Sequence, residues 1–105
     1  MSTSRNKYDA IEKIIFDENL SIKNIEIMPD INKMLVFLST QYILVFPLSQ
    51  YKKLKNATKK DLRHFEIIAN GTGIHWPALD EDLSLKGFLK DTLHLMVTNR
   101  QLVAS

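Results

Sequence analysis

The densest group of polar and aromatic side chains lies near the C-terminal end of the sequence. Its members are His75, Trp76, Asp80, Glu81 and Asp82. An indole beside a row of carboxylates is typical of a surface that binds a basic protein partner, because aromatic side chains anchor interfaces and charged ones surround them. The alternative is structural, with Trp76 in the core and Asp82 or Ser84 capping a following helix. The sequence leaves both interpretations open.

The same residues match no metal or catalytic motif. The spacing of His75 and the three carboxylates fits neither a zinc site nor a calcium loop. None of the histidines, His64, His75 and His94, accompanies a Gly-x-Ser-x-Gly motif or a cysteine. The segment 70–73 lacks the Lys-Ser/Thr ending of a phosphate loop, so a turn with positive φ is predicted there. We therefore expect no enzymatic activity, no metal and no cofactor.

A second candidate site is a basic segment that runs from residue 52 to residue 63. Its basic residues are Lys52, Lys53, Lys55, Lys59, Lys60 and Arg63. With one acidic residue, Asp61, the segment carries +5, so the remainder carries −3 within a total of +2. The cluster indicates either a phosphate-facing patch that binds nucleic acid or a solvated helical face with Leu54 and Leu62 turned inward.

Length and composition limit the class of protein. A chain of 105 residues, 45% hydrophobic and 25% charged, is typical of one globular domain and excludes a disordered protein. It contains no cysteine, which excludes disulfides and thiolate-bound zinc. The polar start shows no signal peptide, and no apolar stretch is long enough to span a bilayer. We expect a cytoplasmic protein with no membrane contact. The near-neutral charge argues against a bulk nucleic-acid coat.

The first half of the chain shows one helical pattern followed by strand patterns. Apolar residues at helical spacing predict a short helix over 9–16, capped by Asp9 and ended by Asn19, although its isoleucines would also suit a strand. In segment 22–27 three isoleucines are separated by polar residues, whereas 34–38 and 42–46 are continuous apolar runs, and short polar breaks separate the three segments. They predict an antiparallel meander that Pro47 ends.

Shorter elements follow in the second half. The pattern predicts a helix over 48–54 and another behind an N-cap at Thr58. Strands are expected at 65–69 and 74–76, followed by a loop at 80–82 and a last helix capped by Ser84. Residues 91–105 suit either an extension of that helix or another strand. The prediction is an α+β fold, a small antiparallel sheet of a meander plus a C-terminal hairpin, packed with short helices. We expect residues 1–19 to form a helical extension, 20–90 the single domain and 91–105 a tail.

One string of residues carries a family resemblance. It comprises Asn56-Ala57-Thr58-Lys59-Lys60-Asp61-Leu62-Arg63, Phe65-Glu66-Ile67, Gly73-Ile74-His75-Trp76-Pro77 and Leu79-Asp80-Glu81-Asp82-Leu83-Ser84. Over roughly residues 20–90 the chain resembles the bacterial domain-of-unknown-function family DUF 2442. One turn and one single residue depart from the family pattern. The meander turn is Ser39-Thr40-Gln41, where an acidic residue and glycine are common, and Lys86 stands where an acidic residue is common.

The resemblance also implies a role. Genes of this family commonly lie in two-gene units that look like toxin–antitoxin or mobile-element cassettes. This resemblance implies a non-enzymatic protein-interaction or regulatory module, antitoxin-like, with the product of a neighbouring gene as the expected partner. The recurrent Arg63 is expected to pair with Asp80 or Glu81 inside the fold. A nucleic-acid-binding regulator that uses residues 52–63 is the alternative, and a homodimer would cover an open sheet edge.

Overall fold

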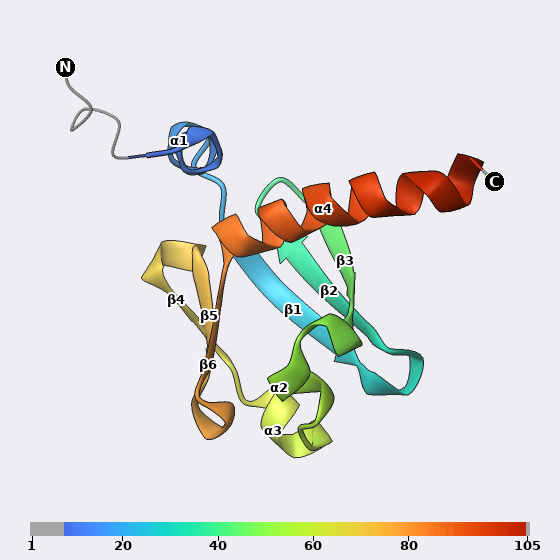
Figure 1. The fold of residues 1–105 in the computed structure, drawn as a ribbon. Helices are drawn as coiled ribbons and strands as arrows, with labels where there is room; N and C mark the ends of the chain where they lie inside the picture. Colours follow the sequence, from blue (N-terminus) through green and yellow to red (C-terminus); the bar gives the residue numbers. More distant parts are fainter. Residues whose placement is uncertain (1–7, 105) are drawn as a thin grey trace.

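Two small antiparallel sheets and one long helix make up the molecule (Figure 1). The computed structural model describes residues 8–104, with side chains from residue 8 to residue 98. Each sheet has three strands, in the order β1-β2-β3 and β4-β5-β6. The long helix α4 crosses the first sheet, and the short helices α2 and α3 lie together at the opposite end (Figure 1). The predicted α+β class is confirmed, with two sheets where one was expected.

The first sheet is the predicted meander. Its strands are β1 (Ile22–Met28), β2 (Lys33–Leu38) and β3 (Ile43–Pro47). In register, Val36 of β2 lies between Ile25 and Leu44, and all three side chains are buried. A short 3₁₀ turn, Pro29–Ile31, joins β1 to β2, with Asn32 in the left-handed conformation. Alternate residues point to opposite faces of a sheet, so this register defines the face that packs on the core.

The second sheet contains a strand that the sequence did not predict. Its strands are β4 (Glu66–Ile68), β5 (Gly73–Trp76) and β6 (Glu81–Ser84). The predicted hairpin of β4 and β5 is present, but the predicted loop at 80–82 was wrong. A 3₁₀ turn at Pro77–Leu79 and left-handed Asp80 reverse the chain. Glu81 and Asp82 then pair with Trp76 and His75 of β5, so the two carboxylates lie on opposite faces of the sheet, with Asp82 exposed and Glu81 half-buried.

The short helices begin at the predicted caps. Helix α1 (Ala10–Asp17) starts with a capping box between Asp9 and Glu12, and Asn19 follows it with a φ of 54°. Helix α2 (Lys52–Lys55) follows a 3₁₀ turn at Leu48–Gln50. Helix α3 (Lys59–Arg63) is capped by Thr58, whose side chain accepts a hydrogen bond from the Asp61 amide at 3.1 Å. Asp9, Asn19 and Thr58 therefore act as the sequence predicted.

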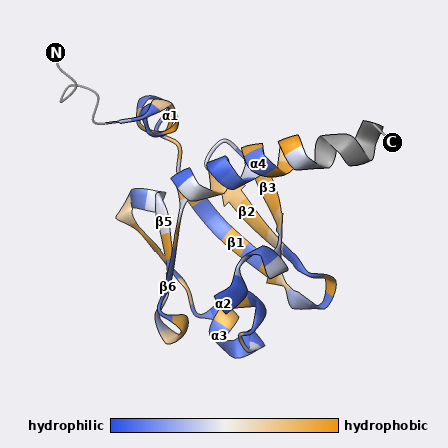
Figure 2. Ribbon diagram, in the orientation of Figure 1, coloured by the Kyte–Doolittle hydropathy of each residue, from blue (hydrophilic) through white to orange (hydrophobic). Residues whose placement is uncertain are grey.

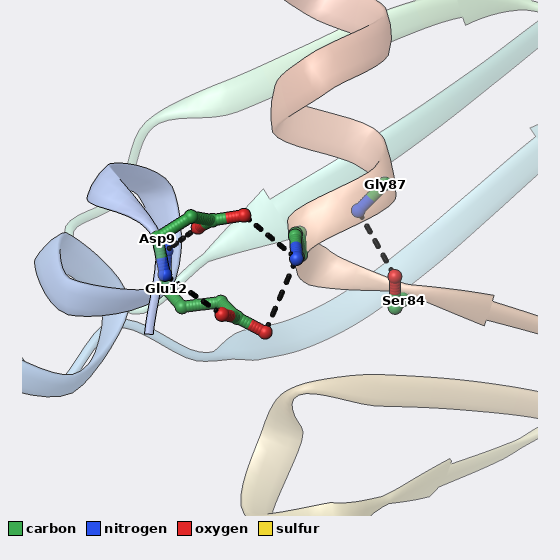
Figure 3. A network of polar contacts seen from close by, with 5 residues as sticks. Asp9, Glu12, Ser84 and Gly87 are labelled. Atoms are coloured by element: carbon green, nitrogen blue, oxygen red, sulfur yellow. Dashed lines mark hydrogen bonds and ion pairs between the residues drawn. The ribbon is translucent and has the colours of Figure 1, made fainter. Parts of the chain in front are cut away.

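The last helix, α4 (Leu85–Ala104), includes most of the tail for which the sequence left a helix or a strand open. Ser84 caps it, accepting a hydrogen bond from the Gly87 amide at 2.9 Å. Residues 91–104 continue the helix, so the helical alternative for the tail is confirmed and the strand alternative is wrong. Lys86 in the first turn forms ion pairs with Asp9 at 2.8 Å and Glu12 at 3.2 Å, which join α4 to α1 (Figure 3). The pKa of the Asp9 carboxyl is lowered, chiefly by its bond to Lys86.

The core lies between the two sheets and the first half of α4. Phe46 of β3 stacks on Phe88 of α4, with ring centroids 5.2 Å apart. The ring of Tyr51 packs edge-on against both phenylalanines, and its hydroxyl donates a hydrogen bond to Asp91 at 2.7 Å. Burial is the main cause that raises the pKa of the Tyr51 phenol, and the hydrogen bond to Asp91 is the second. Gly71, in the turn between β4 and β5, packs directly against Ser21, the residue just before β1. These contacts fix the two sheets relative to each other.

Candidate functional site

The residues of the predicted 75–82 surface do not lie together on one surface. His75 of β5 and Asp82 of β6 are opposite each other on one face of the second sheet, and their side chains are 2.5 Å apart. Glu66 of β4 lies opposite His75 on the same face. Glu81 pairs in register with Trp76 and therefore points to the other face. This distribution leaves a partly exposed pair of His75 and Asp82 in place of the predicted five-residue surface.

Trp76 is a core residue. Its side chain is fully buried, so the predicted role as an exposed interface anchor is wrong and the structural alternative holds. The indole Nε1–H donates a hydrogen bond to the carbonyl of Leu62 at 3.1 Å, and Phe65 lies beside the ring. A Trp fills a core best when its single N–H finds an acceptor, and the orphan carbonyls at a helix end supply one. Trp76 thereby holds the C-terminal end of α3 in place.

The expected pairing of Arg63 with Asp80 or Glu81 was also wrong. In the part of the chain whose side chains are described, Arg63 has no carboxylate within ion-pair distance. The basic side chain that contacts the β5–β6 turn is that of Lys53, on α2. Its ammonium donates a hydrogen bond to the backbone carbonyl of Asp80 at 2.9 Å. The turn therefore approaches α2 instead of the end of α3, and the Arg63 guanidinium remains available.

Across the described residues, no group of three or more His, Cys, Asp or Glu side chains is arranged to hold a metal ion. Over the same part of the chain, no helix combines the length and apolar character that a membrane crossing requires.

The basic segment folds into two neighbouring short helices. All six basic side chains, on α2 and α3, are exposed. Leu54 and Leu62 are buried beneath them, as the solvated-face interpretation predicted. Figure 2 shows both helices as largely hydrophilic. Lys59 forms a long ion pair with Asp30 at 3.5 Å, which joins α3 to the turn after β1.

A groove lies between β1 and α3, which we call the β1–α3 groove. It has a volume of about 420 Å³ and is lined by residues 25–30 on one side and by Lys59, Leu62, Arg63 and Phe65 on the other. Consecutive strand residues point to opposite faces, so a hollow that contacts four strand residues in a row runs along the edge of the strand. Within the described chain β1 pairs only with β2, and its unpaired edge faces the groove along residues 25–28, while β4 lies close to β1 without pairing with it.

The groove combines three kinds of contact. Apolar side chains, among them Ile27, Leu62 and Phe65, form its inner part, and the strand edge offers backbone N–H and C=O groups. Lys59 and Arg63 lie one helical turn apart on α3 and place positive charge along the opposite wall. These two basic residues belong to the basic segment 52–63, for which the sequence predicted a phosphate-facing patch. The strand residues 25–30 were not predicted, and the only signal for them was the expected open sheet edge.

Comparison with known proteins gives a family and two related structures. A crystal structure of a protein of unknown function from Rhodospirillum rubrum is similar with a TM-score of 0.60 and 28% identity, over 69% of this chain and 87% of that one. A solution NMR structure of an uncharacterized protein from Chromobacterium violaceum has a TM-score of 0.63 and 25% identity, over 86% of this chain and 85% of that one. No curated protein matches. The family model "Protein of unknown function (DUF2442)" matches residues 17–93, so the chain belongs to the DUF2442 family.

Proposed function

We propose that this chain is a small non-enzymatic protein-interaction module that binds an extended segment of a partner protein in the β1–α3 groove. The observation that carries the proposal is the open edge of β1 beside an apolar and basic wall. A bound segment adds a fourth strand to the first sheet through backbone hydrogen bonds. The antitoxin-like role in a two-gene unit, suggested by the family resemblance, is one setting in which such binding would act.

The shape and chemistry of the groove favour an extended segment over a compact ligand. A strand edge recognises main chain, which any peptide supplies, and every second side chain of the added strand then points to the same side. Apolar side chains of the segment would pack against Ile27, Leu62 and Phe65, which line the groove. We therefore infer a partner segment that alternates apolar and polar residues.

Charge specifies one further feature of the partner. The Arg63 guanidinium has no carboxylate partner among the described side chains, whereas Lys59 is joined to Asp30. A guanidinium presents several fixed donors and binds a carboxylate in a bidentate geometry. The partner segment therefore carries an acidic side chain, or its own terminal carboxylate, opposite Arg63.

The test uses a display library of random peptides selected against the full chain. Enriched peptides are expected to combine an acidic residue with alternating apolar residues. Arg63→Glu should weaken their binding by roughly 10-fold to 100-fold, because a charge-assisted hydrogen bond contributes about 1.5–3 kcal/mol and the substitution adds repulsion. Binding is measured by titration calorimetry, and the contact region by NMR shifts of the β1 amides.

The matched control is Lys60→Glu. It makes the same change of charge on the same helix but at a residue that does not line the groove. It should alter affinity by no more than a fewfold, since exposed charges act weakly at a distance. Equal losses for both variants, or amide shifts confined to residues away from β1, would contradict the proposal.

A second candidate function is nucleic-acid binding by α2 and α3. The observation that favours it is that all six basic side chains of residues 52–63 are exposed and only Lys59 is ion-paired to a carboxylate within the described side chains. Neighbouring lysines on two short helices can follow a phosphate backbone without reading its sequence. Binding of this kind would be broad in sequence preference.

Salt dependence decides whether this second function exists. If α2 and α3 contact phosphates, binding of a fluorescent duplex or single strand should weaken steeply between low and physiological salt. Replacing Lys52 and Lys55, which lie outside the groove, by glutamate should abolish it without altering peptide binding. No measurable binding at low salt, or binding that these two substitutions leave unchanged, would eliminate this candidate.

A further inference from the structure

The β1–α3 groove ends where the two sheets meet. Gly71 packs against Ser21 so closely that a Cβ on Gly71 would lie 2.6 Å from the Cβ of Ser21. Figure 1 shows the two sheets close together near the start of α4 and farther apart where α2 and α3 lie. The lining of the groove accordingly begins at Ile25 and runs toward Asp30. A segment bound along β1 has no room to continue past the meeting point of the sheets, which is the closed end of the groove.

The two basic residues of the groove lie at different distances from this closed end. Lys59 forms its ion pair with Asp30, just past the far end of β1. From Lys59 the chain continues through Arg63 into β4 and then to Gly71, so it runs antiparallel to β1. Arg63, one helical turn after Lys59, is therefore nearer the closed end. Among the side chains that the structure describes, its guanidinium has no carboxylate within ion-pair distance.

Two residues of β1 present their backbone groups to the groove. The Leu38 amide donates a hydrogen bond to the carbonyl of Tyr42, the residue before β3, at 2.9 Å. Alternate residues of an antiparallel strand bond to opposite neighbours, so even-numbered residues of β2 bond to β3 and odd-numbered ones to β1. Glu26 lies opposite an odd-numbered residue of β2 and bonds to it. Ile25 and Ile27, on either side of Glu26, therefore direct their N–H and C=O groups toward the unpaired edge.

We propose that the β1–α3 groove binds the C-terminal tail of a partner protein, which runs antiparallel to β1 and places its terminal carboxylate at Arg63. The inference rests on the proposed function, because it requires a segment that pairs with β1, and it adds the direction and the end of that segment. A tail that stops at the closed end fits a groove with no exit there. A parallel segment would instead place an N-terminal ammonium beside the guanidinium, and the two like charges would repel each other.

The rest of the partner leaves through the open end of the groove. The Lys59–Asp30 pair joins the two walls at that end, with an N–O distance of 3.5 Å and side chains that are 59% and 82% exposed. A pair with that exposure is weak, so an incoming chain displaces it readily. An acidic group bound at this end would meet the carboxylate of Asp30, which already occupies Lys59. The charges therefore select Arg63 as the site for the terminal carboxylate.

The geometry of the sheet also specifies the last residues of the tail. Side chains opposite Ile25 and Ile27 lie on the core side of the sheet, where Leu62 and Phe65 form the inner wall of the groove. The last and third-last residues of the tail are therefore apolar. The residue between them lies opposite Glu26, whose side chain is exposed on the outer face. A basic side chain is favoured there, because oppositely charged cross-strand pairs stabilise a sheet.

The test selects short random peptides against the full chain from two display libraries, one with a free C-terminus and the other with a free N-terminus. Only the first library should yield binders, and their last three residues should be apolar, basic and apolar. Binders of similar affinity from both libraries would overturn this inference but leave the proposed function standing, because the groove would then bind peptides without their terminal carboxylate. If neither library yields a binder, the proposed function fails and the inference fails with it.

The role of Arg63 is measured with one enriched peptide, made as its free acid and as its C-terminal amide. Titration calorimetry should show that the amide binds about 10-fold to 100-fold more weakly, because it loses a charge-assisted hydrogen bond. Arg63→Gln should weaken the free acid to the level of the amide, whereas Lys60→Gln, outside the groove, should preserve the difference between the two peptides. A difference that persists in Arg63→Gln would place the carboxylate elsewhere and refute the assignment.

The direction of the tail is determined with a nitroxide spin label on the N-terminal end of the same peptide. An antiparallel tail places that end near Asp30, so the label should broaden the amide NMR signals of Ile31 and Asn32 most strongly. The strongest broadening at Ser21 and Gly71 would instead show a parallel tail and reject the proposal.

Discussion

Replacing Trp76 by alanine should remove most of the stability of this protein, by about 3–5 kcal/mol. The side chain is fully buried between α3 and the second sheet, and its loss leaves a cavity as well as an unbonded carbonyl at Leu62. Small domains have a free energy of unfolding of about 5–15 kcal/mol, so the variant would lie near the limit of folding. Urea denaturation followed by far-ultraviolet circular dichroism measures the change.

A milder substitution keeps this expectation testable if the alanine variant does not fold. Trp76→Phe retains most of the apolar volume but removes the hydrogen bond to Leu62, which should cost about 1–3 kcal/mol. His75→Ala, one residue away, removes only the partly exposed pair with Asp82 and should cost about 1 kcal/mol or less. Equal stability of the Trp76→Phe and wild-type chains would show that the indole N–H does not hold α3.

The second large effect is expected at Gly71. Its φ is +84°, and an added Cβ would lie 2.6 Å from the Cβ of Ser21 and 3.3 Å from the backbone oxygen of Ile22. Gly71→Ala should therefore destabilise the fold by about 2–4 kcal/mol, combining left-handed strain with a forced separation of the two sheets. The midpoint of urea unfolding measures this loss.

Gly87→Ala is the matched comparison. Gly87 lies in the first turn of α4, where an added Cβ would approach only the hydroxyl oxygen of Ser84, at 3.1 Å. Alanine gains about 1 kcal/mol over glycine within a helix, and that gain opposes the close contact with the cap. The net change should stay within about 1 kcal/mol of zero. If both alanine variants lost the same stability, the special geometry at Gly71 would be refuted.

Local chemistry explains which elements the sequence predicted. Caps depend on one side chain and the next few amides, so Asp9, Thr58 and Ser84 could be assigned without a structure. Strand β6 was missed because Asp80, Glu81 and Asp82 together are typical of a loop. Their role as a strand depends on the reversal at Asp80 and on the presence of β5, and neither is encoded in the local pattern.

The candidate site was less predictable because it is assembled from distant segments. Trp76 looks the same in sequence whether it is buried or exposed, and only the position of α3 decides that it donates to Leu62. The β1–α3 groove joins residues 25–30 to Lys59 and Arg63, which lie 29 to 38 positions later. The basic residues could be noticed as a cluster, but the strand edge that gives two of them a shared role exists only in the folded chain.

Lys86 attaches helix α1 to the rest of the fold through ion pairs. The family model begins at residue 17, so most of α1 is an addition to the shared body, and no residue of α1 is fully buried. Two partly exposed ion pairs from Lys86 contribute to its attachment, and mobile ions screen such pairs far more than they affect a packed core. The attachment of α1 therefore depends partly on ion pairs. Raising the ionic strength should detach α1 at salt concentrations that leave the rest of the fold intact.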